Sequence, residues 1–343
     1  MSGTKRHINP KYNRHAAKVY TEQECIEGLP HDRQVLSWLI SKSESKDLEA
    51  ESLLNNVLEA VPVAKPTQRF AISGSPGVGK STFINSYAKH LVDNGHKVAI
   101  LPVDPTSYLS KGSILGDKTR MEDLVGNSGA FIKPVASSLA LGGIAPSSRV
   151  SISLCERAGF DTIFVETVGV GQSEYEVRHL VDMFMLLIQP GSGDDLQGIK
   201  RGIMEMADIL VVTKADGDMN SVALQSAKNL KKAVSIFRDN SFEWLPKVHV
   251  YSSVTHAYRE QLDEGIQKYF DHMSEESRLE TLRHQQSTKY FDESIDDIIL
   301  AAFKSRKDVS SAIEQLKEGV KNKSIMPLNA IQVFKDKIRD IDD

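Results

Sequence analysis

Hydrophobic positions along the chain follow different periods in three successive regions. Between residues 22 and 61, apolar side chains recur at the three- and four-residue spacing of amphipathic helices. Pro62 and Pro66 then interrupt this pattern. From residue 68 to about residue 273, short apolar runs alternate with stretches of helical spacing, and after residue 274 the chain is polar and helical again. The short runs are residues 69–74, 97–104, 161–167, 183–189, 208–215 and 247–253.

Apolar runs separated by segments long enough for crossover helices predict a mainly parallel sheet covered by helices on both faces. We therefore predict an α/β protein with helical extensions at both ends. The expected division is an N-terminal helical extension at 1–61, a central domain at 62–273 and a C-terminal helical region at 274–343. The C-terminal region carries an apolar stripe that needs a partner surface, on this subunit or on another. The stripe consists of Ile295, Ile298, Ile299, Ala302 and Phe303.

Composition narrows the class of protein. With 343 residues, of which 40% are hydrophobic and 26% charged, the chain is typical of soluble globular proteins. The net charge of −4 gives no reason to expect a nucleic-acid partner, and no apolar run of about 18 or more residues predicts a membrane span. Two isolated cysteines, Cys25 and Cys155, indicate neither a disulfide framework nor a metal ribbon. The basic N-terminal segment has no apolar stretch of a secretory signal, so we expect a cytoplasmic protein.

The first apolar run leads into GSPGVGKST, residues 74–82, which satisfies the phosphate-loop pattern G-x-x-x-x-G-K-[ST]. Its glycines let backbone amides face the α- and β-phosphates of a nucleotide, and the following helix adds the positive end of its dipole. We expect Lys80 to reach the β- and γ-phosphates and Ser81 to hold magnesium. The fold is then that of a P-loop NTPase. The expected nucleotide-binding positions in the loop are Gly74, Ser75, Gly77, Val78, Gly79, Lys80, Ser81 and Thr82.

A second motif concerns the base of the nucleotide. The apolar run at residues 208–215 continues into TKAD, residues 213–216, which is close to the N-K-x-D pattern of GTPases. Asp216 can accept hydrogen bonds from N1–H and the exocyclic amine of guanine, which adenine does not offer, and Lys214 can lie along the base. Thr213 replaces the usual Asn that braces the phosphate loop, so the bracing is left open. One strand later, the YSSV segment supplies a serine-containing loop with Ser252 and Ser253.

An unusual spacing follows the buried run at residues 161–167, where Glu166 and Gly169 form E-x-x-G in place of the common D-x-x-G. The Gly amide of such a motif can turn toward the terminal phosphate, and a longer Glu side chain reaches a metal ion that lies farther from its strand. Magnesium takes few protein ligands and completes its octahedron with phosphate and water. For Asp117, a solvated loop carboxylate is an equally good interpretation. The expected direct or water-mediated magnesium contacts are Ser81, Asp104, Asp117 and Glu166.

A series of segments in this order resembles the MeaB/ArgK-type GTPases over roughly residues 22 to 273. The segments are GSPGVGKST, VDPTS, GSILGDKTRM, LGGIAPSSR, LCERAGFDTIFVETVGVGQSE, QPGSGDDLQGIKRGIMEMAD and TKAD. The resemblance implies a homodimeric enzyme that hydrolyses GTP to GDP with Mg2+, with the C-terminal region as a dimerisation arm. It also implies a chaperone role toward an adenosylcobalamin-dependent acyl-CoA mutase, whose cofactor delivery it gates and which it protects or reactivates.

The same resemblance assigns roles to individual residues. It places Asp104 and Asp117 in a first switch and residues 166–174 in a second. A third mobile loop matches residues 191–200 and ends in Lys200, which approaches the nucleotide when the partner binds. A cation delivered there can stabilise charge on the transferred phosphoryl group. The expected catalytic residues are Lys80, Glu166 and Lys200; without the resemblance, Lys200 would be interpreted as a surface lysine.

Three other functions remain open at the level of sequence. A metallochaperone-type GTPase for another metalloenzyme would share the phosphate loop, but it needs soft or imidazole ligands, and the ten histidines form no H-x-H pair. A P-loop kinase would need an acceptor pocket and would prefer ATP, which the TKAD segment argues against. A scaffold that binds nucleotide without hydrolysing it is the third alternative. The sequence does not identify the client mutase.

Overall fold

The computed structural model describes residues 18–45, 47–104, 121–136, 146–167, 173–191, 201–235 and 242–339. The chain divides into two compact units, Met1–Leu279 and Glu280–Asp343. The first unit contains the sheet and the helices that cover it. In the described part of the second unit, the backbone is helical.

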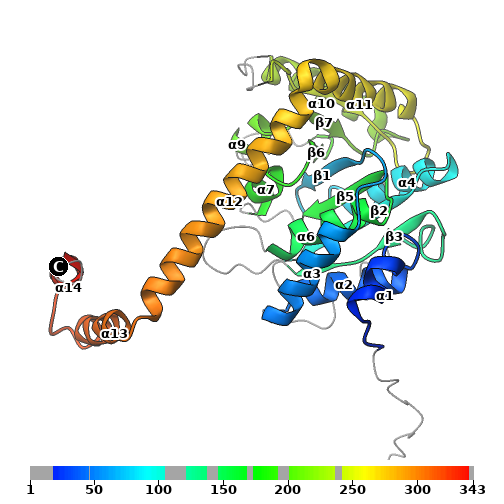
Figure 1. Cartoon of the computed structure of the whole chain (residues 1–343). Helices are drawn as coiled ribbons and strands as arrows, with labels where there is room; N and C mark the ends of the chain where they lie inside the picture. Colours follow the sequence, from blue (N-terminus) through cyan, green and yellow to red (C-terminus); the bar gives the residue numbers. More distant parts are fainter. Residues whose placement is uncertain are drawn as a thin grey trace, which may run out of the picture. The chain divides into compact units, whose positions relative to one another are not determined.

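A parallel sheet forms the centre of the first unit (Figure 1). Its strands are β1 (Gln68–Gly74), β2 (Val98–Asp104), β3 (Ala130–Ile132), β4 (Val135–Ala136), β5 (Thr162–Thr167), β6 (Met183–Ile188), β7 (Ile209–Val212) and β8 (Lys247–Val250). Their order is β3-β2-β5-β1-β6-β7-β8, with β4 also paired to β2, and every one of these pairs is parallel. The predicted α/β fold is therefore confirmed, and the six apolar runs form β1, β2 and β5–β8. The sequence pattern did not predict the short strands β3 and β4.

Helices of the first unit connect and cover the strands. They are α1 (Glu22–Gly28), α2 (Arg33–Ser43), α3 (Leu48–Ala60), α4 (Lys80–Asp93), α6 (Pro146–Arg157), α7 (Ser173–Arg178), α9 (Arg201–Glu205), α10 (Met219–Val234) and α11 (Arg259–Ser274), followed by the 3-10 turn η1 (Glu275–Ser277). The N-terminal helices start at side-chain caps. Thr21 forms a capping box with Glu24 at α1, while Asp32 and Asp47 accept hydrogen bonds from the first turns of α2 and α3.

Alternate residues of a strand point to the same face of the sheet. On one face, aromatic residues of β1 and β5 contact each other and the helices α4 and α11. Phe70 of β1 and Phe164 of β5 have ring centroids 5.2 Å apart. Phe70 also contacts Phe270 of α11 at 5.5 Å, and Phe164 contacts Tyr87 of α4 at 6.3 Å. These ring contacts attach α11 to β1, the strand that precedes the phosphate loop, and α4 to β5, the neighbour of β1 in the sheet.

A largely aliphatic core contains the residues that alternate with these aromatics. It includes Ala71 of β1 and Val165 of β5, together with Val177 of α7. Both cysteines lie in the same core, Cys25 on α1 and Cys155 on α6, and each is fully buried as a free thiol. Burial raises the pKa of the Cys25 thiol to about 11 and raises the pKa of Cys155 as well, so neither thiol ionises at neutral pH.

The second unit consists of helices whose apolar residues are partly exposed. The helix α12 (Arg278–Ser305) spans the boundary between the units and is followed by α13 (Lys307–Lys321) and α14 (Pro327–Arg339). The predicted stripe lies on α12, where Ile298 and Ile299 are 62% and 61% exposed. Across the described ranges of the whole chain, no helix is both long enough and apolar enough to span a membrane.

A buried ion pair connects the start of β7 to the end of α7. Asp208 Oδ1 lies 3.2 Å from a guanidinium nitrogen of Arg178, and Asp208 Oδ2 accepts a hydrogen bond of 2.7 Å from the amide of Phe184 on β6. The carbonyl of Asp208 accepts a bond of 3.0 Å from Trp244 Nε1. The side chain of Asp208 is only 2% exposed, so its interactions are made away from water.

We predict that Asp208→Ala lowers the free energy of unfolding by about 3 kcal/mol or more, because it takes the carboxylate away from a buried guanidinium. Urea denaturation followed by circular dichroism measures this change. Asp93→Ala is the control, since Asp93 and its partner Lys89 are exposed and such pairs contribute less than about 1 kcal/mol. Equal effects of the two substitutions would contradict the structural role of Asp208.

Candidate functional site

The phosphate loop connects the carboxyl end of β1 to the first residue of α4. Gly74 has φ 149°, and a Cβ at this position would lie 2.5 Å from the carbonyl oxygen of Leu187 on β6. Gly79 is the N-cap of α4 with φ 99°, in the left-handed region, and its carbonyl accepts the amide of Phe83 at 2.8 Å. Backbone geometry therefore requires glycine at both ends of the loop. The amide of Val78 donates to the carbonyl of Ser75 at 3.2 Å and closes the turn between them.

Lys80 lies over the loop from the first position of α4. Its Nζ donates to the carbonyl of Gly74 at 2.7 Å and to that of Ser75 at 3.3 Å. Burial lowers the pKa of Lys80, and the carboxylates of Glu166 and Glu174 partly oppose this shift. An ammonium group in this position can attract phosphate oxygens to the loop.

Ser81 and Glu166 come together although they are far apart in sequence. Strand pairing places Glu166 of β5 beside Ile72 of β1, and Ser81 Oγ donates to Glu166 Oε1 at 2.8 Å. Hydroxyl and carboxylate oxygens are ligands that Mg2+ prefers, so the two side chains fit this ion. In the described ranges, no group of three or more His, Cys, Asp or Glu side chains is arranged as a metal site. The fit to magnesium therefore rests on this hydroxyl–carboxylate pair, with phosphate and water as the other ligands.

Four predicted site residues, or their side chains, lie outside what the structure describes. Gly169, Asp117 and Lys200 lie outside the described residues. Asp104 is the last residue of β2, two positions beyond Pro102, which pairs with Glu166, but its side chain is not described. Their roles stay predictions. Thr82 follows Ser81 on α4 and is exposed.

Thr213 braces the phosphate loop from the end of β7. Its hydroxyl donates to the carbonyl of Val78 at 2.9 Å, and its side chain is buried. The amide of Thr213 donates to the carbonyl of Ile188 on β6 at 2.9 Å. The question left open by the missing Asn is answered, because the shorter Thr hydroxyl makes a brace of its own.

The next residues form the predicted base site. Lys214 has φ 56°, and its Nζ donates to the carbonyl of Gly77 at 3.1 Å. The hydroxyl of Ser252 donates to Asp216 Oδ2, and the same Ser252 oxygen accepts the amide of Thr255 at 3.1 Å. Ser252 therefore holds both the carboxylate and its own loop, and Ser253 beside it is half-buried. The carboxylate of Asp216 is an acceptor suited to the paired donors of guanine.

A further hydrogen-bond network, which no sequence pattern predicts, holds the base loop against α4. Ser86 Oγ of α4 lies 2.8 Å from the hydroxyl of Tyr251 and 3.0 Å from His256 Nδ1. His256 has φ 58°, so the loop takes an uncommon backbone conformation at this contact. No motif signals this network, because its members are separated by 165 and 170 positions in the chain.

We predict that Thr213→Val weakens GDP binding roughly tenfold, because it leaves the buried carbonyl of Val78 without its donor and loosens the loop. Titration with a fluorescent GDP analogue measures the dissociation constant. Thr213→Ser keeps the hydroxyl and is expected to bind GDP like the unmodified protein. A normal affinity of Thr213→Val would show that the brace does not contribute to nucleotide binding.

Comparison with known proteins agrees with this geometry. Residues 34–308 match the family model described as methylmalonyl Co-A mutase-associated GTPase MeaB. GTPase ArgK of Escherichia coli (strain K12) is 37% identical over 302 residues, which cover 88% of this chain and 91% of that protein. The methylmalonic aciduria type A homolog of Mus musculus, a mitochondrial protein, is 38% identical over 311 residues, covering 86% and 73% of the two chains.

A solved structure is also similar over most of its length. The crystal structure of a LAO/AO transport system kinase superposes with a TM-score of 0.72 at 29% identity and covers 94% of this chain and all of that chain. The P-loop fold, the geometry of the phosphate loop and the match of residues 34–308 to the family model all indicate the same family. This chain belongs to the MeaB family of P-loop GTPases.

Proposed function

We propose that this protein is a Mg2+-dependent GTPase that acts as a chaperone of an adenosylcobalamin-dependent acyl-CoA mutase, with methylmalonyl-CoA mutase as its client. Its GTPase cycle gates cofactor delivery and protects or reactivates the mutase. The observation that carries the proposal is the meeting of three groups at one edge of the sheet: the phosphate loop with Lys80, the Ser81–Glu166 pair, and Asp216 held by Ser252. The family name and the mouse relative support the choice of client.

Different residues of the chain bind the phosphates, the metal ion and the base of GTP. Loop amides and Lys80 bind the phosphates, and in doing so Lys80 exchanges the carbonyls of Gly74 and Ser75 for phosphate oxygens. Ser81 and Glu166 would hold Mg2+, which when bound would supply positive charge against the phosphates of the nucleotide. Asp216 selects guanine, and Lys214 supports the base from a position already bonded to the loop. Glu166 replaces the shorter Asp because its carboxylate has to span from β5 to Ser81.

We further propose that the protein works as a homodimer and that hydrolysis accelerates when the mutase binds. Exposed apolar residues of α12, among them Ile298 and Ile299, favour the C-terminal region at 274–343 as the dimerisation arm. The family resemblance favours Lys200 as the cation delivered on partner binding. The N-terminal region at 1–61 and the GTPase domain at 62–273 complete the proposed division.

We predict that Asp216→Asn weakens GTP binding roughly 10- to 100-fold and partly admits xanthosine triphosphate, because the amide can no longer accept two hydrogen bonds from guanine. Competition titrations of GTP, ATP and xanthosine triphosphate measure the preference. Asp218→Asn is a matched control, since Asp218 is exposed and makes no cap hydrogen bond at α10. Equal affinity of the unmodified protein for ATP and GTP would refute the assignment of the base.

We predict that Lys200→Ala loses the stimulation of hydrolysis by methylmalonyl-CoA mutase, because a cation supplied on demand contributes roughly 10³–10⁵ in rate in related switches. Single-turnover hydrolysis with and without the purified mutase measures the stimulation, and the basal rate of each variant is its own reference. Lys200→Arg keeps the positive charge and is expected to retain stimulation. Undiminished stimulation of Lys200→Ala would show that Lys200 is a surface lysine without a role in hydrolysis. The absence of stimulation in the unmodified protein would instead overturn the choice of client.

A further inference from the structure

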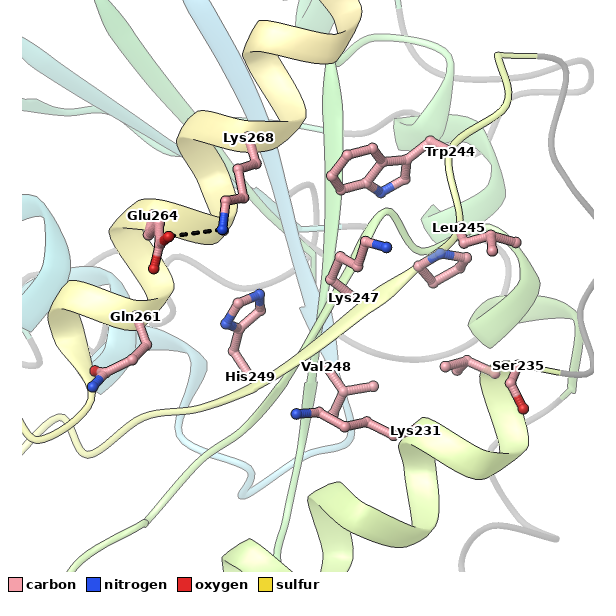
Figure 2. A pocket seen from close by; sticks show the side chains of 13 residues that line it. Lys231, Ser235, Trp244, Leu245, Lys247, Val248, His249, Gln261, Glu264 and Lys268 are labelled. Carbon is pink, nitrogen blue, oxygen red and sulfur yellow. Dashed lines mark hydrogen bonds and ion pairs between the residues drawn. The ribbon is translucent and has the colours of Figure 1, made fainter.

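A pocket with a volume of about 540 Å³ lies at the outer edge of the sheet, between the end of α10, the strand β8 and the middle of α11 (Figure 2). This volume falls within the range of roughly 300–1,000 Å³ that small-molecule sites occupy. Neither the phosphate loop nor the base loop contributes a residue to its lining. The pocket is therefore separate from the nucleotide site.

Apolar side chains provide one wall of the pocket, with Trp244, Pro246 and Val248 among them. Two contacts fix the indole of Trp244: Nε1 donates to the carbonyl of Asp208 at 3.0 Å, and the ring meets Tyr269 edge-on at 5.1 Å. A rigid aromatic wall loses little side-chain entropy when a flat or aliphatic group packs on it.

Lysines surround the same pocket from all three elements. Lys231 comes from α10, Lys247 from β8 and Lys268 from α11, while Glu264 is the one acidic side chain of the lining (Figure 2). Glu264 is paired with Lys268 at 2.7 Å, so it neutralises that lysine. Lys247 lies over the ring of Trp244 at 5.3 Å, and Lys231 forms no ion pair within the described part of the chain. Two positive charges therefore remain beside an apolar wall.

His249 lies between these charges and completes the polar side. Its imidazole packs on α11 at Gly265, where a Cβ would lie 2.3 Å from Nε2, so the helix carries a glycine where the ring needs the space. Nε2 is buried and has no hydrogen-bond partner among the described residues, which favours the neutral ring with its hydrogen on Nδ1. Burial and the positive charges of Lys231, Lys268 and Lys247 lower the pKa of His249, and Glu264 opposes them in part. At neutral pH the imidazole is an uncharged donor.

We propose that this pocket binds a small organic anion, a phosphate or carboxylate carried on an aromatic or aliphatic body. Its charged group is balanced by Lys231 and Lys247 and accepts a hydrogen bond from His249, while its apolar body packs against Trp244 and Val248. An inorganic anion alone leaves the apolar wall in water, and a neutral apolar compound leaves the lysines without a counter-charge. Both parts of the ligand are needed for binding to be favourable.

Binding of phenyl phosphate and of benzoate tests the proposal, with inorganic phosphate and benzyl alcohol as the anion-only and apolar-only probes. The protein is kept saturated with GDP and Mg2+, so that no probe enters the phosphate loop. The chain has two tryptophans, so in a Trp38→Phe background the emission reports Trp244 alone. We expect phenyl phosphate or benzoate to change this emission with a dissociation constant below about 1 mM, and each single-function probe to bind at least about tenfold more weakly. The stronger of the two aryl anions identifies the charged group.

Substitutions then locate the site. Lys231→Met combined with Lys247→Met is expected to weaken the better aryl anion roughly tenfold. Lys232→Met is the matched control, because Lys232 is exposed on the same last turn of α10 but does not line the pocket. Equal binding of inorganic and phenyl phosphate, equal loss in the control, or no response of Trp244 at about 1 mM aryl anion would each overturn the proposal.

Discussion

Because all strands of the sheet are parallel, every described part of the nucleotide site lies where the strands have their carboxyl ends. With β1 between β5 and β6, Ile72 lies beside Glu166 and Gly74 beside Leu187. The approach of Gly74 to the carbonyl of Leu187 leaves no room for a side chain, so the loop cannot change its first residue without moving β6 away from β1. The pairing of β1 with its two neighbours therefore fixes the position of the phosphate loop. The same pairing places Glu166 within hydrogen-bond distance of Ser81 at the start of α4.

The two halves of the nucleotide site are physically joined. Thr213 and Lys214, at the end of β7, hold the carbonyls of Val78 and Gly77 in the phosphate loop. Asp216, two residues further, is held by Ser252 after β8. A movement of β7 relative to β1 would thus disturb the phosphate loop and the proposed base site together.

The sequence was informative where one local pattern dictates the structure. Buried strands are continuous apolar runs, so β1, β2 and β5–β8 were predictable, whereas β3 and β4 have three and two residues and no periodicity of their own. The loop glycines were found because a motif fixes their spacing. The Thr213 brace and the Ser86–Tyr251–His256 network were not predictable, since a hydrogen bond across more than a hundred positions depends on how the completed fold places its loops.

The same reasoning applies to the pocket beside β8, because the space for His249 comes from Gly265 on a different element. A glycine within a helix such as α11 is by itself only a weak signal in a sequence. The structure explains this glycine, because the imidazole of His249 occupies the space that a side chain at this position would need. Three lysines that are far apart in the sequence line the same cavity.

Both thiols of the chain are buried in the first unit, Cys25 on α1 and Cys155 on α6. A thiol-specific reagent can reach either sulfur only while the packing around it opens. The labelling rate of each cysteine therefore measures how often the packing around that residue opens locally. Because α6 packs against the N-terminal helices α2 and α3 and both thiols belong to one core, equal labelling rates would indicate that α1 and α6 open together, and unequal rates that each opens separately.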